Sequence, residues 1–137
     1  MRGYQHCLVV LGLTLLGAAE GSGQSTGAAK PAGGPVSPVQ ARRGETAFNQ
    51  SCSACHTTAQ FNSEAFARTW NERPIIELFE QLRSSMPQDN PGRLTREEYL
   101  DVVLYLFKLN GAAEGVQELA PTEEVLRATK IKLKVTN

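Results

Sequence analysis

The sequence has no net charge, because 14 lysines and arginines balance 14 aspartates and glutamates. A nucleic-acid-binding domain usually carries excess positive charge that neutralises phosphates. The balance therefore predicts no nucleic-acid partner, and it does not indicate a strongly acidic surface. No internal repeat is visible along the 137 residues.

The sequence also lacks a hydrophobic run of membrane-spanning length. The apolar run from Cys7 to Ala19 is shorter than the roughly 20 residues that a spanning helix needs. Arg2 precedes this run and small residues close it, which is the layout of an export signal. We predict that residues 1–20 are a signal peptide, that the mature protein is periplasmic, and that no stable membrane span remains after cleavage.

Sulfur and imidazole ligands for metals are scarce, since the sequence holds three cysteines, two histidines and two methionines. Signal cleavage would remove Cys7, His6 and Met1. The remaining residues of these types are Cys52, Cys55, His56 and Met86. Each of the four is a candidate ligand of one site.

The segment Cys52-Ser53-Ala54-Cys55-His56 is the most informative part of the sequence. Two thiols at this spacing can add across the two vinyl groups of a haem, and the adjoining imidazole can reach its iron. We predict one haem c, attached covalently through two thioethers at Cys52 and Cys55, with His56 as an iron ligand. Export agrees with this chemistry, because two close thiols in an oxidising compartment would otherwise form a strained disulfide.

Two other interpretations of the thiols are open. A redox dithiol normally sits at a helix start after a strand, and no strand pattern precedes Ser51. A zinc site would need a fourth protein ligand beyond two thiols and one histidine. Both alternatives are less favoured than haem.

Met86 follows His56 by thirty residues, in a loop stiffened by Pro87 and Pro91. A thioether ligand stabilises ferrous iron and raises the reduction potential, and two fixed axial ligands suit electron transfer. We predict Met86 as the second axial ligand. If Met86 does not bind iron, the alternative is an open-site haem protein that binds a small ligand.

The composition divides the chain into four parts. Residues 21–37 are Gly, Ala, Ser and Pro with almost no large apolar residue, which predicts a flexible linker. We expect one small domain at 38–111 and a C-terminal tail at 112–137. The tail is either solvated or a partner-docking arm, with a short helix capped at Thr122 and an alternating apolar stretch after it.

Helix signals recur through the domain, and no convincing strand pair precedes residue 130. Gly44 lies on the inward face of the first expected helix, which suggests a close approach of another backbone. The expected helices are Pro38 to about Ser51, one starting at Asn62 or Ser63, one starting at Pro74, and one from the capping box at Thr95 and Glu98 to Asn110. The fold class is therefore all-α, with three to five helices around the covalently bound haem.

From Arg42 to Gly111 the sequence resembles the class I cytochromes c. The matching features are Gly44-x-x-x-Phe48 before Cys-x-x-Cys-His, Ser85-Met86-Pro87, and the closing segment 94–111. The resemblance implies a small cytochrome c-like fold in which the first and last helices cross. It also implies an electron carrier without catalytic residues, which passes single electrons between a redox donor and a redox acceptor.

The middle of the domain carries a narrower resemblance. Phe66-x-x-x-Trp70, Arg73-Pro74 and Asn90-Pro91-Gly92 are most similar to cytochrome subunits that accompany quinoprotein alcohol dehydrogenases. This similarity implies a quinoprotein dehydrogenase as a partner that supplies electrons for the respiratory chain. A subunit whose main task is to dock on such a periplasmic dehydrogenase is a further alternative.

The sequence departs from the cytochrome c pattern after the haem motif. Thr57 stands where the family often has glycine, and the short loop to Phe61 has no proline whose carbonyl could hold the imidazole. Some other carbonyl must then orient the His56 ring. The short loop also suggests that one haem edge is open to solvent.

Overall fold

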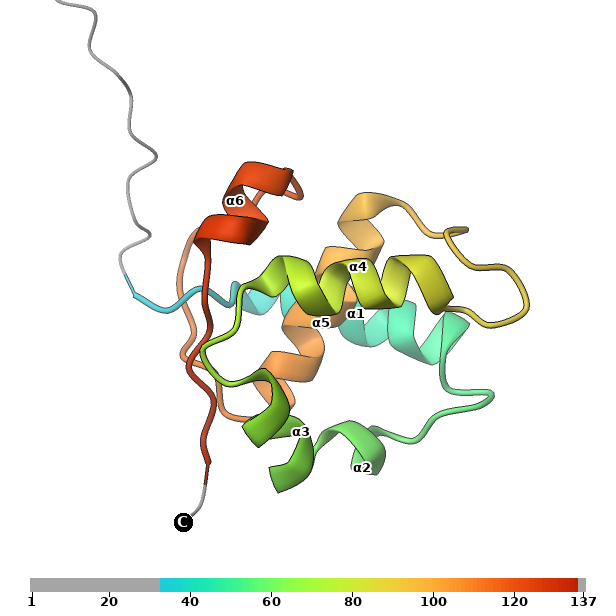
Figure 1. The fold of residues 1–137 in the computed structure, drawn as a ribbon, viewed down its shortest axis with the longest axis horizontal. Coiled ribbons are helices and arrows are strands. Elements are labelled where there is room, and N and C mark those ends of the chain that lie inside the picture. The colour runs from blue at the N-terminus through green and yellow to red at the C-terminus, as the bar shows by residue number, and fades with distance from the viewer. Residues whose placement is uncertain (1–32, 136–137) are drawn as a thin grey trace, which may run out of the picture.

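The computed structural model describes residues 33–135, which form six helices (Figure 1). Their bounds are α1 Pro38–Ser51, α2 Thr58–Phe61, α3 Glu64–Trp70, α4 Ile75–Ser85, α5 Arg96–Leu109 and α6 Glu123–Ala128. Within residues 33–135 the extended segments form isolated bridges rather than a sheet. The all-α prediction is confirmed, and the predicted signal peptide at 1–20 lies outside the described residues. No described helix has both the length and the apolar character needed to cross a membrane.

Local capping interactions start and stop the two longest helices. The Ser37 hydroxyl accepts a hydrogen bond from the Val39 amide at 3.3 Å at the start of α1. At the start of α5, Thr95 accepts from the Glu98 amide at 3.2 Å, and the Glu98 carboxylate accepts from the Thr95 amide at 2.8 Å. Gly111 ends this region with a φ of 73°. These predicted boundaries are confirmed.

Two differences from the expected helices concern short elements. The four-residue helix α2 was not predicted, because one turn is too short to show a hydrophobic period. The helix expected at Pro74 begins one residue later, and Pro74 is its cap. The helices α3 and α6 begin after Ser63 and Thr122, as predicted.

The helices α1 and α5 cross at Gly44. A Cβ atom at Gly44 would lie 1.8 Å from the carbonyl oxygen of Asp101, so no side chain fits there. One turn further along α1, the ring of Phe48 packs against that of Tyr105 at 5.8 Å. The predicted close approach at Gly44 is confirmed.

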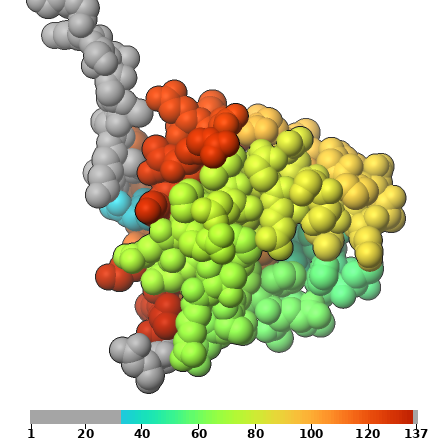
Figure 2. Space-filling view, viewed as in Figure 1, coloured from blue at the N-terminus to red at the C-terminus, as the bar shows by residue number. Residues whose placement is uncertain are grey.

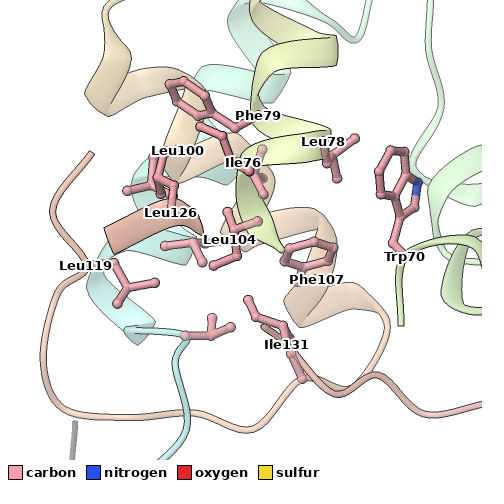
Figure 3. Close-up of a cluster of buried hydrophobic side chains, with 14 of the residues drawn as sticks. Trp70, Ile76, Leu78, Phe79, Leu100, Leu104, Phe107, Leu119, Leu126 and Ile131 are labelled. Atoms are coloured by element: carbon pink, nitrogen blue, oxygen red, sulfur yellow. The ribbon is translucent and has the colours of Figure 1, made fainter. Parts of the chain in front are cut away.

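The main hydrophobic core lies between α4, α5 and the C-terminal tail (Figure 3). Phe79 and Leu104 belong to one cluster with Leu126 and Ile131, and all four side chains are at least 99% buried. The prediction of a solvated or exposed tail is wrong. The alternation after α6 exists, but its apolar side chains face the domain and cover α4 and α5.

Polar contacts also hold the tail to the domain. The buried Gln40 amide donates to the Leu119 carbonyl at 2.9 Å and accepts from the Leu119 amide at 2.8 Å. Arg43 on α1 pairs with Asp101 on α5 and with Glu118 in the tail. The last residues of the predicted linker, 33–37, also pack against the start of the tail. The tail is therefore part of the folded unit.

Candidate functional site

The two thiols are presented by a tight turn at the C-terminal end of α1. The amides of Cys55 and His56 both donate to the Cys52 carbonyl, at 3.1 and 2.9 Å. Cys52 is half-buried and Cys55 is exposed, and the two are not joined by a disulfide. One thiol therefore faces the domain interior while the other remains accessible beside it.

The surroundings of Cys52 argue against a redox dithiol. Burial raises the pKa of the Cys52 thiol, and the positive charge of Arg93 only opposes this shift. Reactive dithiols have lowered thiol pKa values and lie at helix N-termini, whereas Cys52 caps the C-terminal end of α1. The turn suits thiols that serve as attachment points.

The His56 ring lies between an aromatic side chain and an amide. Phe61 contacts it edge-on, with ring centroids 5.4 Å apart. His56 Nδ1 lies 3.2 Å from Gln60 Oε1, and the same oxygen accepts a hydrogen bond from the Thr57 amide at 3.0 Å. This arrangement leaves Nε2 as the ring nitrogen available to a metal.

Met86 lies at the end of another helix, half-buried after the last turn of α4. Its amide donates to the Leu82 carbonyl at 2.8 Å, and its carbonyl accepts from the Tyr99 hydroxyl at 2.6 Å. The Tyr99 oxygen in turn accepts from the Gly92 amide at 3.0 Å. A buried residue of α5 thus fixes both sides of the Met86 loop.

A second apolar cluster connects the Cys-His turn with the end of α4. Its buried members are Phe48, Val102, Tyr105 and Leu106. Cys52, Phe61, Phe66 and Leu82 pack against them but remain partly exposed. The ring of Phe61 joins this surface through Phe48 at 5.9 Å and Phe66 at 6.1 Å. The structure therefore brings Cys52, Cys55 and His56 together, and Met86 lies one turn beyond a residue of the same cluster.

The residues present fit a haem. Two unpaired thiols adjoin an imidazole with a free nitrogen, and partly exposed aromatic and aliphatic side chains extend from them to Leu82, four residues before Met86. A flat apolar group could cover these side chains. Among residues 33–135, no three His, Cys, Asp or Glu side chains are grouped so that they could hold a metal ion.

The Met86 loop and the tail lie on different sides of the molecule. In Figure 2 the tail (red) occupies the left side, and the loop after α4 (yellow to orange) projects at the right. In Figure 1 the turn after α1 also lies on the right. The tail therefore does not cover the Cys-His turn.

Sequence reasoning missed two residues that act on the site. Gln60 was not identified, although its position three residues after Thr57 is the spacing of a capping pair. Tyr99 was not identified either, because only the fold places its hydroxyl beside the Met86 carbonyl. Trp70 is buried, and the guanidinium of Arg73 lies 5.0 Å from its ring centroid.

Comparison with family models gives one match, which covers residues 39–106 and is described as cytochrome c oxidase, cbb3-type, subunit III. The matched range contains the Cys-His turn, the Met86 loop and most of α5. Comparisons with curated proteins and with solved structures give no match.

Proposed function

We propose that this c-type cytochrome domain, which carries covalently bound haem c, is an exported single-electron carrier. The observation that carries the proposal is the turn of Cys52, Cys55 and His56 beside an apolar surface that extends to Leu82, four residues before Met86. An enzyme would need a positioned acid, base or nucleophile at the open face. The contacts at this site instead hold two potential axial ligands in fixed positions.

Each site residue has a distinct role in this proposal. Cys52 and Cys55 form the two thioethers, and His56 binds iron through Nε2. Met86 would supply a second iron ligand through its thioether, and Tyr99 restrains the backbone that carries it. The bound haem supplies an iron that changes between ferric and ferrous states. The surrounding apolar side chains exclude water from it.

Three further observations support the proposed location and partners. The export signal predicted at residues 1–20 supports a periplasmic carrier. The resemblance of the middle segment supports a quinoprotein dehydrogenase as donor, either as a diffusing partner or with this chain as its docked subunit. The family match supports a second candidate, an electron-delivering subunit of a terminal oxidase.

Visible spectra of the matured full chain test the proposed site. In the ferric protein we expect the weak long-wavelength band of methionine sulfur on iron, and we expect Met86→Ala to abolish it. The reduction potential should also fall in Met86→Ala, by tenths of a volt within the roughly 0.8 V that axial ligands span. Ser85→Ala is the matched control on the neighbouring exposed residue.

Other outcomes would identify the alternatives. Covalent haem without the sulfur band would favour the open-site, ligand-binding protein. A chain without covalent haem would refute the proposal altogether. Cell fractionation, compared with a chain lacking residues 2–20, tests export, and co-purification with a dehydrogenase or an oxidase separates the two partner classes.

A further inference from the structure

The side chain of Gln60 lies where two hydrogen-bond donors meet. Its Oε1 atom is 3.0 Å from the Thr57 amide nitrogen and 3.2 Å from His56 Nδ1. Gln60 is the third residue of α2, and its own amide donates to the Thr57 carbonyl at 3.1 Å. The start of α2 therefore fixes the side chain that faces the histidine.

The Thr57 contact identifies which nitrogen of the His56 ring donates to Gln60. A backbone N–H can only donate, so the Gln60 atom beside it is the carbonyl oxygen and not the amide nitrogen. That oxygen can only accept, so Nδ1 of His56 carries a proton. The neutral ring then presents the lone pair of Nε2, which is the tautomer that can bind iron.

We propose that Gln60 is the positioning residue of the His56 ligand, fixing its ring orientation and tuning its strength as a donor to iron. The inference rests on the proposed function. The loop from His56 to Phe61 has no proline, and the amide side chain takes the place of a backbone carbonyl partner. A stronger acceptor at Nδ1 makes the imidazole more basic, which stabilises ferric iron.

Substitutions at Gln60 can either strengthen or remove the hydrogen-bond acceptor for His56 Nδ1. Gln60→Glu retains an acceptor for the Thr57 amide and strengthens the hydrogen bond to Nδ1, because the acceptor becomes charged. Gln60→Leu keeps a side chain of comparable bulk but removes the acceptor. Gln50→Glu is the matched control, since it adds the same charge at an exposed position near the end of α1.

The experiment compares the reduction potentials of the haem-loaded full chain and its three variants. We expect Gln60→Glu to disfavour reduction about tenfold and Gln60→Leu to favour it about tenfold, each equal to about 59 mV for one electron. Gln50→Glu should change the potential much less. In the ferrous protein, NMR should show that the Nδ1 proton of His56 exchanges with solvent faster in Gln60→Leu.

A role for Gln60 in capping alone predicts a different result. Gln60→Leu would then lower stability, but the potentials of both Gln60 variants would equal that of the wild type, and this would overturn the inference. Haem staining of the unfolded wild-type chain reports the proposed function separately. An unstained chain would overturn both the proposed function and the role of Gln60. A stained chain whose Gln60 variants have unchanged reduction potentials would overturn only the role of Gln60.

Discussion

The Tyr99 hydroxyl connects the two ends of the loop that carries Met86. It donates to the Met86 carbonyl and accepts from the Gly92 amide, while its ring is 99% buried against Phe79. A phenylalanine could keep the ring packing but neither hydrogen bond. The hydroxyl therefore contributes to the rigidity of the loop rather than to the core.

We expect Tyr99→Phe to loosen Met86 without unfolding the domain. Loss of the two hydrogen bonds should cost about 1 kcal/mol, because water can reach the exposed Gly92 and the half-buried Met86. Added imidazole, which would compete with the proposed Met86 ligand for iron, should bind about fivefold more tightly. Spectral titration measures this affinity, with Tyr105→Phe as the control. Equal affinities in wild type and Tyr99→Phe would contradict the role of the hydroxyl.

The ion pair of Glu118 with Arg43 should make the free energy of unfolding depend on pH. Its hydrogen bond with Arg43 lowers the pKa of the Glu118 carboxyl. The folded state therefore binds this proton less readily than the unfolded chain, and the stabilisation is present at neutral pH and lost as the pH falls through the folded-state pKa. Burial raises the pKa of Asp101 and acts in the opposite direction, but Asp101 is present in both proteins compared below.

We expect Glu118→Gln to lower the free energy of unfolding at pH 7 by less than about 1 kcal/mol, because solvent screens this exposed pair. The difference from wild type should begin to shrink below the ordinary glutamate pKa of about 4.3, and it should disappear only once the pH has fallen through the lowered folded-state pKa of Glu118. Urea unfolding at several pH values measures it. A difference that grows on acidification would show that the sign is wrong.

At the scale of elements, the crossing of α1 and α5 depends on one missing side chain. In Gly44→Ala the added Cβ would overlap the Asp101 carbonyl and lie 2.9 Å from the Tyr105 Cβ, so the helices must separate. We expect a loss of roughly 3 kcal/mol despite the better helix propensity of alanine. Thermal unfolding of Gly44→Ala and of the exposed control Glu45→Ala tests this. Equal stability of the two variants would mean that the crossing adapts at little cost.

The predictable elements are those encoded by neighbouring residues. Ser37 and the pair Thr95 and Glu98 specify helix starts within one turn of chain, so α1 and α5 could be predicted. The position of the tail depends on contacts between residues far apart in the sequence. The alternation of apolar and polar residues after α6 does not show which surface the apolar side chains cover. The same distinction applies to the site, because the Cys-x-x-Cys-His spacing is local, whereas the contact of Gln60 with His56 requires the fold of α2.

At the scale of the whole molecule, the tail contributes part of the core. Leu126 is fully buried, whereas Val116 in the same tail is 83% exposed. We expect Leu126→Ala to cost about 2–5 kcal/mol and Val116→Ala less than about 0.5 kcal/mol. Urea unfolding of both variants measures the difference. A tail that packs only loosely in solution would give two similar, small values.

The two apolar clusters should respond differently to the absence of haem. The main cluster joins α4, α5 and the tail without any of the four predicted site residues, whereas the second cluster includes Cys52 and other partly exposed side chains. In Cys52→Ala/Cys55→Ala, which cannot hold haem c, we expect amide protection to fall across residues 52–66 and to persist at the centre of α5. Local opening of this kind follows from the few buried contacts around the Cys-His turn.

Hydrogen exchange of the haem-loaded wild type and the double variant measures this pattern residue by residue. Persistent protection in α5 would show that the main cluster of α4, α5 and the tail folds without haem. Haem would then order mainly the segment that binds it. Equal loss of protection in both clusters would instead show one cooperative unit that requires haem throughout. The first outcome is expected because Leu126, Ile131 and Leu133 supply buried apolar surface that a domain ending at Gly111 would lack.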